Sequence, residues 1–171
     1  LIHGPAALEP LHGITAIAVE SCADMERAVI DSIHAADGLV MAAAVADYRP
    51  ETAAPQKIKK RDDRLALNLV RTSDILSAVA SRRGAGGRLR AVIGFAAETR
   101  DVLDNAREKL ARKKLDLIVA NDVSAADSGF EVDTNRVTLL DAAGGVQALP
   151  LMSKTAAAEQ IIDRLVAILE R

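Results

Sequence analysis

The chain has 171 residues, of which 50% are hydrophobic and 2% aromatic, so it can fill the core of one compact domain with Ala, Val, Leu and Ile. Its 22 basic and 24 acidic residues leave a net charge of -2, so the chain lacks the strong positive electrostatic field that would attract nucleic acid. The single cysteine and the lack of any apolar run of roughly 20 residues exclude an internal disulfide and a membrane-spanning helix, and we expect a cytoplasmic protein.

The N-terminal part of the chain alternates between strand and helix patterns. Residues 1–5 are typical of the end of a strand that enters a turn, and residues 15–19 form a short β-prone run. Apolar side chains then recur at helical spacing through residues 23–35. Residues 38–45 are apolar without alternation, which predicts a parallel strand covered on both faces.

Residues 47–72 interrupt this alternation. Pro50 and Pro55 exclude a regular helix, so residues 47–60 are predicted to form a long loop or flap. Further along, Leu65, Leu67 and Leu69 alternate with other side chains, which indicates a half-buried strand.

Ser73 and Asp74 can cap a helix that buries Ile75, Leu76 and Val79. Residues 91–95 and 115–120 are then predicted to be buried strands on either side of a helix over residues 101–113, with Leu103, Ala106 and Leu110 facing inward. This order of strands and helices predicts an α/β fold of the Rossmann-like kind, a three-layer parallel sheet with helices on both faces.

The C-terminal residues predict a hairpin followed by a helix. Residues 137–140 and 146–149 flank a turn, and Ser153 can cap the last helix. One apolar stripe of that helix is predicted to face inward, made of Ala158, Ile161, Ile162, Leu165 and Leu169.

Ligands of an open parallel sheet bind beyond the carboxyl ends of its strands. Small or polar residues follow three predicted strands, at 43–49, at 94–99, and at Asn121 and Asp122. Each stretch alone is equally typical of an ordinary solvated loop. Three of them at one edge of the sheet favour a pocket.

The small side chains of residues 42–46 leave the main chain accessible to a ligand such as a base ring. Asp47 could accept a hydrogen bond from a ribose hydroxyl or an exocyclic amine, or bind Mg2+. The alternative is a turn aspartate that pairs with Arg49.

Two groups of basic residues could meet phosphate. Residues 57–61 carry four of them in a segment with proline, as a lid over a triphosphate requires, although a charged edge strand that blocks aggregation has the same pattern. Lys109 and Lys113 share one face of a predicted helix, where they could instead only complement the helix dipole. No residue set has the spacing of a metal site, so metal ligands remain unassigned.

Seven segments resemble, in order, the phosphopantothenoylcysteine synthetase family. They are AAAVADYRP (42–50), APQKIKK (54–60), RTSDIL (71–76), GFAAET (94–99), KLARKKLDLIVAND (109–122), GFEVDTNRVTLL (129–140) and SK (153–154). Any one of them is a weak signal, whereas a chance match to the whole set is improbable.

The resemblance implies a Rossmann-like ligase domain that forms a homodimer through the flap and dimerisation segment at 47–72. It implies that CTP, with Mg2+, activates the carboxylate of 4'-phosphopantothenate as an acyl-cytidylate with release of pyrophosphate, and that cysteine then displaces CMP to give phosphopantothenoylcysteine. From the net charge and the lack of a long apolar run, we expect neither a nucleic-acid nor a membrane partner.

The resemblance also implies roles for particular residues. Lys57 matches the flap lysine associated with catalysis, and Asn121 and Asp122 fall at the same edge of the sheet as further pocket candidates. The residues that would contact the nucleotide are Met41, Ala42, Ala43, Asp47, Lys57, Ser73, Asp74, Ile75, Leu76, Phe95, Lys109 and Lys113.

Two features of the family would precede Leu1: its first strand with a Gly-rich loop, and an Asn-Arg-Ser-Ser-Gly-type segment with an asparagine linked to turnover. We therefore expect these 171 residues to be a fragment that alone binds nucleotide weakly and catalyses poorly. Bacterial members are commonly fused upstream to a flavin-dependent decarboxylase, so FMN would belong only to such a fused domain.

Two other functions fit the same fold. A nucleotide-cofactor oxidoreductase would need a GxGxxG loop after the first strand and has no use for a lysine flap. A non-catalytic nucleotide-binding dimer would bind CTP without catalysing a reaction, so replacing Lys57 could not lower a catalytic rate.

Overall fold

The computed structural model describes residues 1–6, 12–54, 56–59, 65–84, 86–98, 101–122 and 133–171. These residues form two compact units. The first comprises Leu1–Val29 and Ala44–Ile75, and the second comprises Ile30–Ala43 and Leu76–Arg171. No helix in the described ranges is both long enough and apolar enough to cross a membrane.

The first unit begins with a pair of short parallel strands and a helix. Strand β1 (Ile2–His3) pairs with β2 (Ile17–Ala18), as the β-prone patterns of these residues predict. Helix α1 (Cys22–Ser32) follows and buries Met25 and Val29. The helix lies close to its predicted bounds, because the apolar side chains recur at helical spacing.

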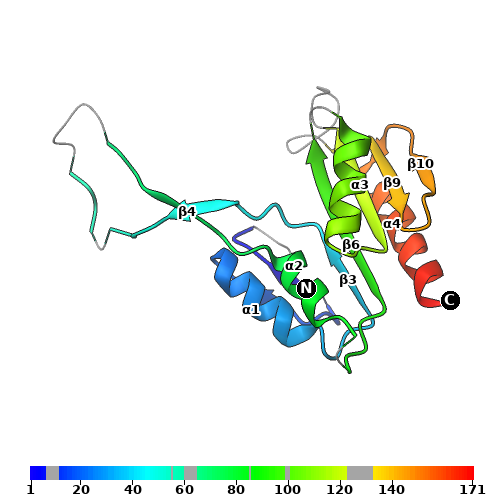
Figure 1. Ribbon diagram of the computed structural model, residues 1–171, viewed down its shortest axis with the longest axis horizontal. Helices are drawn as coiled ribbons and strands as arrows, with labels where there is room; N and C mark the ends of the chain where they lie inside the picture. The colour runs from blue at the N-terminus through cyan, green and yellow to red at the C-terminus, as the bar shows by residue number, and fades with distance from the viewer. Residues whose placement is uncertain (7–11, 55, 60–64, 85, 99–100, 123–132) are drawn as a thin grey trace. The chain divides into compact units, whose positions relative to one another are not determined.

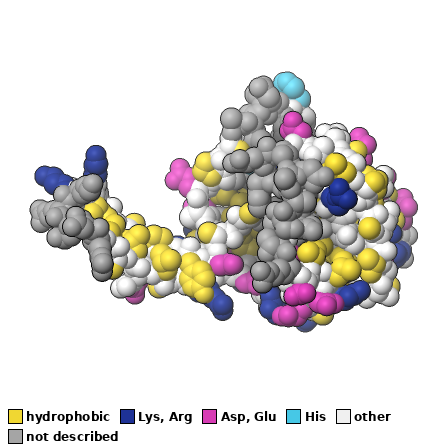
Figure 2. Space-filling model, turned by 90° about the horizontal axis from the view of Figure 1, so that it is seen from above, with side chains coloured by type: hydrophobic (Ala, Val, Ile, Leu, Met, Phe, Trp, Pro, Cys, Tyr) yellow, Lys and Arg dark blue, Asp and Glu magenta, His cyan; other side chains and the backbone are white. Residues whose placement is uncertain are grey.

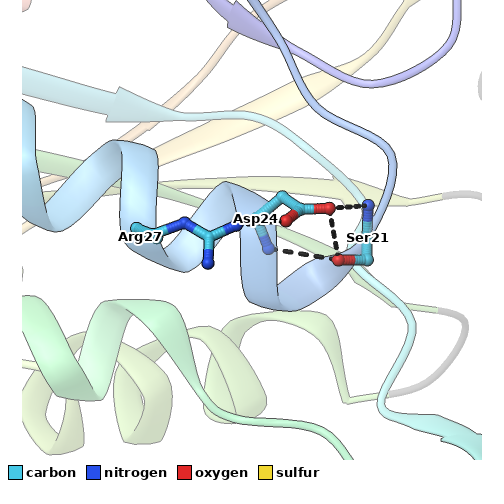
Figure 3. A network of polar contacts seen from close by, with 3 residues as sticks. All are labelled: Ser21, Asp24 and Arg27. Carbon is cyan, nitrogen blue, oxygen red and sulfur yellow. Dashed lines mark hydrogen bonds and ion pairs between the residues drawn. The ribbon is translucent and has the colours of Figure 1, made fainter.

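A reciprocal cap fixes the start of α1 (Figure 3). The Asp24 amide donates to Ser21 Oγ at 3.1 Å, while Asp24 Oδ2 accepts from the Ser21 amide at 3.1 Å and from the Ser21 hydroxyl at 2.6 Å. These hydrogen bonds, the hydroxyl first, hold the pKa of Asp24 below its ordinary value, and Arg27 adds an ion pair. The capping box satisfies amides that an uncapped helix would leave without partners.

The described residues within 48–71, that is 48–54, 56–59 and 65–71, form what we call the arm. Strands β4 (Tyr48–Pro50), labelled in Figure 1, and β5 (Leu69–Arg71) pair antiparallel in it. Tyr48 lies opposite Arg71 in this pair. The predicted flap therefore includes a two-stranded ribbon. The prediction that the leucines at 65, 67 and 69 lie in a half-buried strand is wrong, because β5 begins only at Leu69 and each leucine is more than half exposed.

The second unit is built on a five-stranded mixed sheet with the order β10-β9-β7-β6-β3 (Figure 1). Strands β3, β6 and β7 are parallel, and the predicted C-terminal hairpin, β9 and β10, adds antiparallel to β7. The α/β fold is confirmed, but the hairpin makes the sheet mixed instead of wholly parallel. The bounds are β3 (Gly38–Met41), β6 (Ala91–Glu98), β7 (Leu117–Asp122), β9 (Val137–Asp141) and β10 (Val146–Ala148).

Helix α4 (Lys154–Leu169) covers one face of this sheet. The side chains of a strand alternate between faces, so every second residue of β6, β7 and β9 packs beneath α4. The buried cluster on this face is made of Ile93, Leu117, Val119, Val137, Leu139, Leu149 and Ile161. A short ladder of β8 (Thr134–Asn135) and β11 (Met152–Ser153) leads into the helix, whose predicted Ser153 cap is confirmed by a 3.1 Å hydrogen bond from the Ala156 amide.

The other face of the sheet carries α3 (Val102–Arg112) and α2 (Ile75–Arg82). Ala106 of α3 is fully buried, and Leu76 of α2 lies 3.3 Å from the position that a Cβ on Gly94 would take. The same Cβ would lie 2.7 Å from Leu115 Cδ1, so only glycine fits here without a shift of the neighbours.

Three details of the prediction are corrected. Strand β3 ends at Met41 instead of 45, and it has one neighbour, β6, among the described strands, so its residues are only half-buried. Leu103 is 39% exposed instead of inward. In α4, Ala158 and Ile162 are exposed, because the inward row begins at Ala157 and continues through Ile161.

Candidate functional site

The carboxyl ends of β6 and β7 form the part of the second unit where ligands of such sheets bind. The two strands end side by side, with Ala97 opposite Asn121 and Glu98 opposite Asp122. Two of the sequence-predicted segments therefore lie at one edge of the sheet, which we call the rim. The side chain of Asp122 lies outside the described residues.

A carboxylate gathers two polar side chains at the rim. Lys109 Nζ forms an ion pair with Glu98 Oε1, and Asn105 Nδ2 donates to Glu98 Oε2 at 3.2 Å. Glu98 is the last residue of β6, and the side chains of Glu98 and Lys109 are 16% and 33% exposed. We call Glu98, Asn105 and Lys109 the rim cluster, and it presents one ammonium group at the expected ligand edge.

Lys113 does not join this cluster. It is the C-cap of α3, and its amide donates to Lys109 O at 3.0 Å. Three residues later the Asp116 amide donates to Val92 O at 2.9 Å, near the amino end of β6. The backbone of Lys113 therefore lies toward the opposite edge of the sheet from Glu98.

Phe95 and Asn121 lie on the face beneath α4. Phe95 is half-buried and packs against the core cluster of that face. Asn121 Nδ2 donates to Asn135 Oδ1 at 3.4 Å, which connects the end of β7 to β8. The sheet thus separates these two candidates from the rim cluster, which lies on the α3 face, and the two groups can approach one ligand only over the rim itself.

The end of β3 carries the next candidates. Met41 pairs with Gly94 of β6, and Ala42 and Ala43 follow with their side chains exposed. Leu76, which belongs to α2, has a buried side chain. The accessible main chain that the sequence predicted after this strand is present at Ala42 and Ala43.

In the first unit, Asp47 is tied to the segment before α2. The Thr72 amide donates to Asp47 O at 2.9 Å, and the Thr72 hydroxyl donates to Ala46 O at 2.6 Å. The carboxyl-bearing side chain of Asp47 is exposed, and Arg49 donates to Pro50 O at 3.1 Å. These contacts fix the main chain of the Asp47 segment without using its carboxylate.

Ser73 is held by α1 of the same unit. Its hydroxyl donates to Glu26 Oε2, and Cys22 Sγ donates to Ser73 O at 3.6 Å. Asp74 is exposed and Ile75 is buried, so Ile75 could contact a ligand only through its main chain. The polar candidates Asp47 and Ser73 are therefore each fixed by described hydrogen bonds in the first unit.

The basic segment of the arm is only partly described. Lys57 and Lys59 are exposed, whereas Lys60 and Arg61 lie outside the described residues. The structure gives Lys57 the exposure that contact with a phosphate requires.

Sequence reasoning missed the polar residues that support these candidates: Glu98, Asn105, Asn135 and Glu26. The signal for Glu98 was present, because the strand period of two puts it on the face of α3, where Asn105 and Lys109 lie one turn apart. Groups of three or more His, Cys, Asp or Glu side chains that could hold a metal ion do not occur within the described ranges.

Comparisons with known proteins agree on one family. Residues 1–169 match the family model described as DNA/pantothenate metabolism flavoprotein C-terminal domain. The chain is 43% identical over 169 residues to the Coenzyme A biosynthesis bifunctional protein CoaBC of Bacillus subtilis and 43% identical over 164 residues to that of Vibrio cholerae, covering 98% and 95% of this chain. The chain spans 41% and 40% of the length of these curated relatives.

A solved structure agrees with this match. The crystal structure of the C-terminal domain of Coenzyme A biosynthesis bifunctional protein CoaBC superposes with a TM-score of 0.79 at 35% identity. The match covers 99% of this chain and 73% of that one. The family indicated by the sequence motifs is thereby confirmed.

Proposed function

The chain belongs to the family of DNA/pantothenate metabolism flavoprotein C-terminal domains, and from this membership we propose that it acts in coenzyme A biosynthesis as a CTP-dependent phosphopantothenate–cysteine ligase. The reaction forms an amide between cysteine and 4'-phosphopantothenate, with CMP and pyrophosphate as the other products. The observation that supports it most strongly is the rim cluster, which presents the ammonium group of Lys109 where such a sheet binds its ligand.

The proposed chemistry has two steps. A carboxylate oxygen of 4'-phosphopantothenate attacks the α-phosphorus of CTP, and the bond to pyrophosphate breaks. The amine of cysteine then attacks the acyl carbon, loses a proton, and expels CMP. In both steps negative charge accumulates on phosphate oxygens, so cations fixed near them lower the barrier.

Each group of candidate residues has a part in this proposal. The exposed main chain at Ala42 and Ala43 would contact the base, and Asp47 with Ser73 and Asp74 would contact the ribose or base. Lys109 would bind the β- or γ-phosphate. Lys57, whose side chain is exposed, would contact the α-phosphate.

Mg2+ would reduce the charge of the triphosphate and assist the departure of pyrophosphate. The described side chains include no cluster of three or more metal-binding groups, so phosphate oxygens and water would supply most of its ligands. This agrees with the usual behaviour of Mg2+, which keeps several waters and binds through substrate phosphates.

We further propose that the partner of the arm is a second copy of this chain. Figure 2 shows hydrophobic side chains exposed along the arm, and those of Tyr48, Ile58 and Leu65 are 54%, 54% and 65% exposed. Apolar residues gathered in this way mark an interaction surface. A homodimer would cover them with identical residues.

The test is pyrophosphate release by the protein as its gene encodes it, with CTP, Mg2+, 4'-phosphopantothenate and cysteine. We expect release that depends on CTP and on 4'-phosphopantothenate, and amide formation that depends on all three substrates. Lys57→Gln should lower kcat by about 100-fold or more while the Kd for CTP changes little. Lys59→Gln, an equal change of charge two residues away on the same exposed segment, should retain most of the rate.

The alternatives give different outcomes. Binding of CTP without any pyrophosphate release would favour the non-catalytic nucleotide-binding dimer. Binding of a nicotinamide or flavin nucleotide in place of CTP would favour the oxidoreductase. Equal losses of rate in the two lysine variants would remove the special role of Lys57.

A further inference from the structure

Glu98 is the member of the rim cluster to which neither the motifs nor the proposed reaction gives a role. Both oxygens of its carboxylate are used, one by Lys109 and one by Asn105 at 3.2 Å. The side chain of Glu98 is 16% exposed. By contrast, Glu108 and Arg112, which form an ion pair on the surface of α3, are 69% and 56% exposed. Glu98 is therefore a fixed negative charge in contact with the cation that is proposed to bind phosphate.

The backbone explains why this contact forms. Glu98 follows Gly94 and Ala96 on the α3 face of β6, at the last position of the strand. Asn105 and Lys109 lie four residues apart on α3, and helical side chains tilt toward the helix N-terminus. Because α3 starts just beyond the carboxyl end of β6, this tilt brings the ammonium group of Lys109 toward the rim.

A phosphate bound to Lys109 would meet this carboxylate. Two anions on either side of one ammonium group lie roughly 5 Å apart, which is inside the Debye length of about 8 Å at physiological salt, so salt screens their repulsion only in part. The carboxylate also shares the charge of Lys109 before any ligand arrives. An opposing effect exists, because Glu98 keeps Lys109 ordered and an ordered side chain loses less entropy on binding.

We propose that Glu98 is an affinity-setting counter-ion of Lys109, which competes with the polyphosphate of the nucleotide and weakens the binding of both CTP and pyrophosphate. This inference rests on the proposed function. Glu98→Gln separates the two effects, because the glutamine side chain keeps the same length and can still contact Asn105, so most of the local order is retained while the charge is lost. The consequence for the reaction is faster departure of pyrophosphate after the acyl-cytidylate forms.

The experiment compares three variants of the protein as its gene encodes it: Glu98→Gln, Lys109→Ala and Glu108→Gln. Titration calorimetry gives the Kd for CTP with Mg2+, for pyrophosphate and for cytidine, and thermal unfolding checks that each variant is folded. Glu98→Gln should tighten the binding of CTP and pyrophosphate by about three- to fivefold, because a partly exposed charge pair contributes up to about that factor. Its Kd for cytidine should not change, and pyrophosphate should become a stronger product inhibitor.

The controls separate the possible explanations. Glu108→Gln changes the net charge equally but lies in an exposed pair, so its Kd values should stay within about twofold of the parent. Lys109→Ala should weaken the two phosphate-bearing ligands and not cytidine.

The results that would overturn the proposal are distinct. Weaker or unchanged binding of CTP and pyrophosphate in Glu98→Gln, with Lys109→Ala impaired as expected, would reject the counter-ion role alone and leave the proposed function intact. If Lys109→Ala binds both ligands normally, the phosphate role of Lys109 fails and the role of Glu98 fails with it. If the parent protein binds neither ligand, the proposed function itself is wrong.

Discussion

The arm and the five-stranded sheet use similar apolar residues to opposite effect. Leu65 and Leu67 of the arm are 65% and 58% exposed, whereas Leu117 and Ile93 of the sheet are fully buried. Both regions show sequence patterns typical of strands. The difference is that α4 covers the sheet, while among the described residues the apolar side chains of the arm stay exposed. An alternating apolar pattern alone therefore shows neither that a strand forms at each residue nor which surface will bury the side chains.

The largest expected effect tests the sheet. Leu117→Ala should lower the free energy of unfolding by about 2–5 kcal/mol, because it removes buried atoms and leaves a cavity beneath α4. Urea denaturation measures this change. The matched variant Leu67→Ala, measured at a protein concentration where monomers dominate, should change it by less than about 0.5 kcal/mol. Equal losses in the two variants would show that the arm is buried within its own chain.

The second effect tests the arm. Replacing Leu65 and Leu67 together by serine should raise the dissociation constant of the proposed homodimer by about tenfold or more, because each leucine loses apolar burial against a second chain. Analytical ultracentrifugation measures this constant, and the unfolding of the monomer should be unaffected. A dimer of undiminished affinity would place the interface elsewhere.

The contrast also explains what the sequence could predict. The buried strands predicted at 91–95 and 115–120, the cap at Ser153 and the C-terminal hairpin depend on local patterns and on cover supplied by the chain itself, and these predictions were confirmed. The exposure of the leucines in the arm depends on what covers them, which spacing along the chain cannot report. The same limit applies to Leu103. Helical spacing placed this residue on the inward face of its helix, whereas its side chain is exposed.

For the candidate site, the sequence located the edge of the sheet but not the arrangement of side chains on it. Lys109 and Lys113 share a helix face in sequence, yet Glu98 holds Lys109 at the rim while the backbone of Lys113 lies toward the opposite edge of the sheet. Whether two cations four residues apart reach one ligand depends on where the helix starts and ends relative to the strands. That relation becomes known only once the strands are paired.

A smaller effect tests the cap at the start of α4, with an exposed position of the arm as the control. Ser153→Ala should destabilise the protein by about 1 kcal/mol, because the Ala156 amide loses its side-chain acceptor. Thr52→Ala in the arm, an exposed position, serves as the control and should leave stability unchanged. Urea midpoints give both values, and a neutral Ser153→Ala would mean that water replaces the cap without loss.

The smallest effect depends on pH. Hydrogen bonds led by the one from the Gly145 amide hold the pKa of Asp141 below its ordinary value of 3.8, and Arg164 contributes an ion pair at 2.9 Å. A lowered pKa in the folded state gives stability that is present above the unfolded pKa and is lost as the pH falls through the folded pKa. Asp141→Asn should therefore cost about 0.5–1 kcal/mol at pH 7 and progressively less below about pH 4.

Glu51→Gln in the exposed arm is the matched control for this pH series, and its stability should equal that of the parent at every pH. Unfolding free energies from pH 7 to about pH 2 test both variants. A cost of Asp141→Asn that stays constant or grows on acidification would contradict the assigned role of the charged carboxylate.

The most direct test of the proposed ligase follows one oxygen atom. 4'-Phosphopantothenate labelled with oxygen-18 in its carboxylate is incubated with CTP, Mg2+, cysteine and the protein as its gene encodes it, and the products are analysed by mass spectrometry. An acyl-cytidylate requires one labelled oxygen to appear in the phosphate of CMP. Unlabelled CMP, or label in orthophosphate together with CDP, would contradict this pathway.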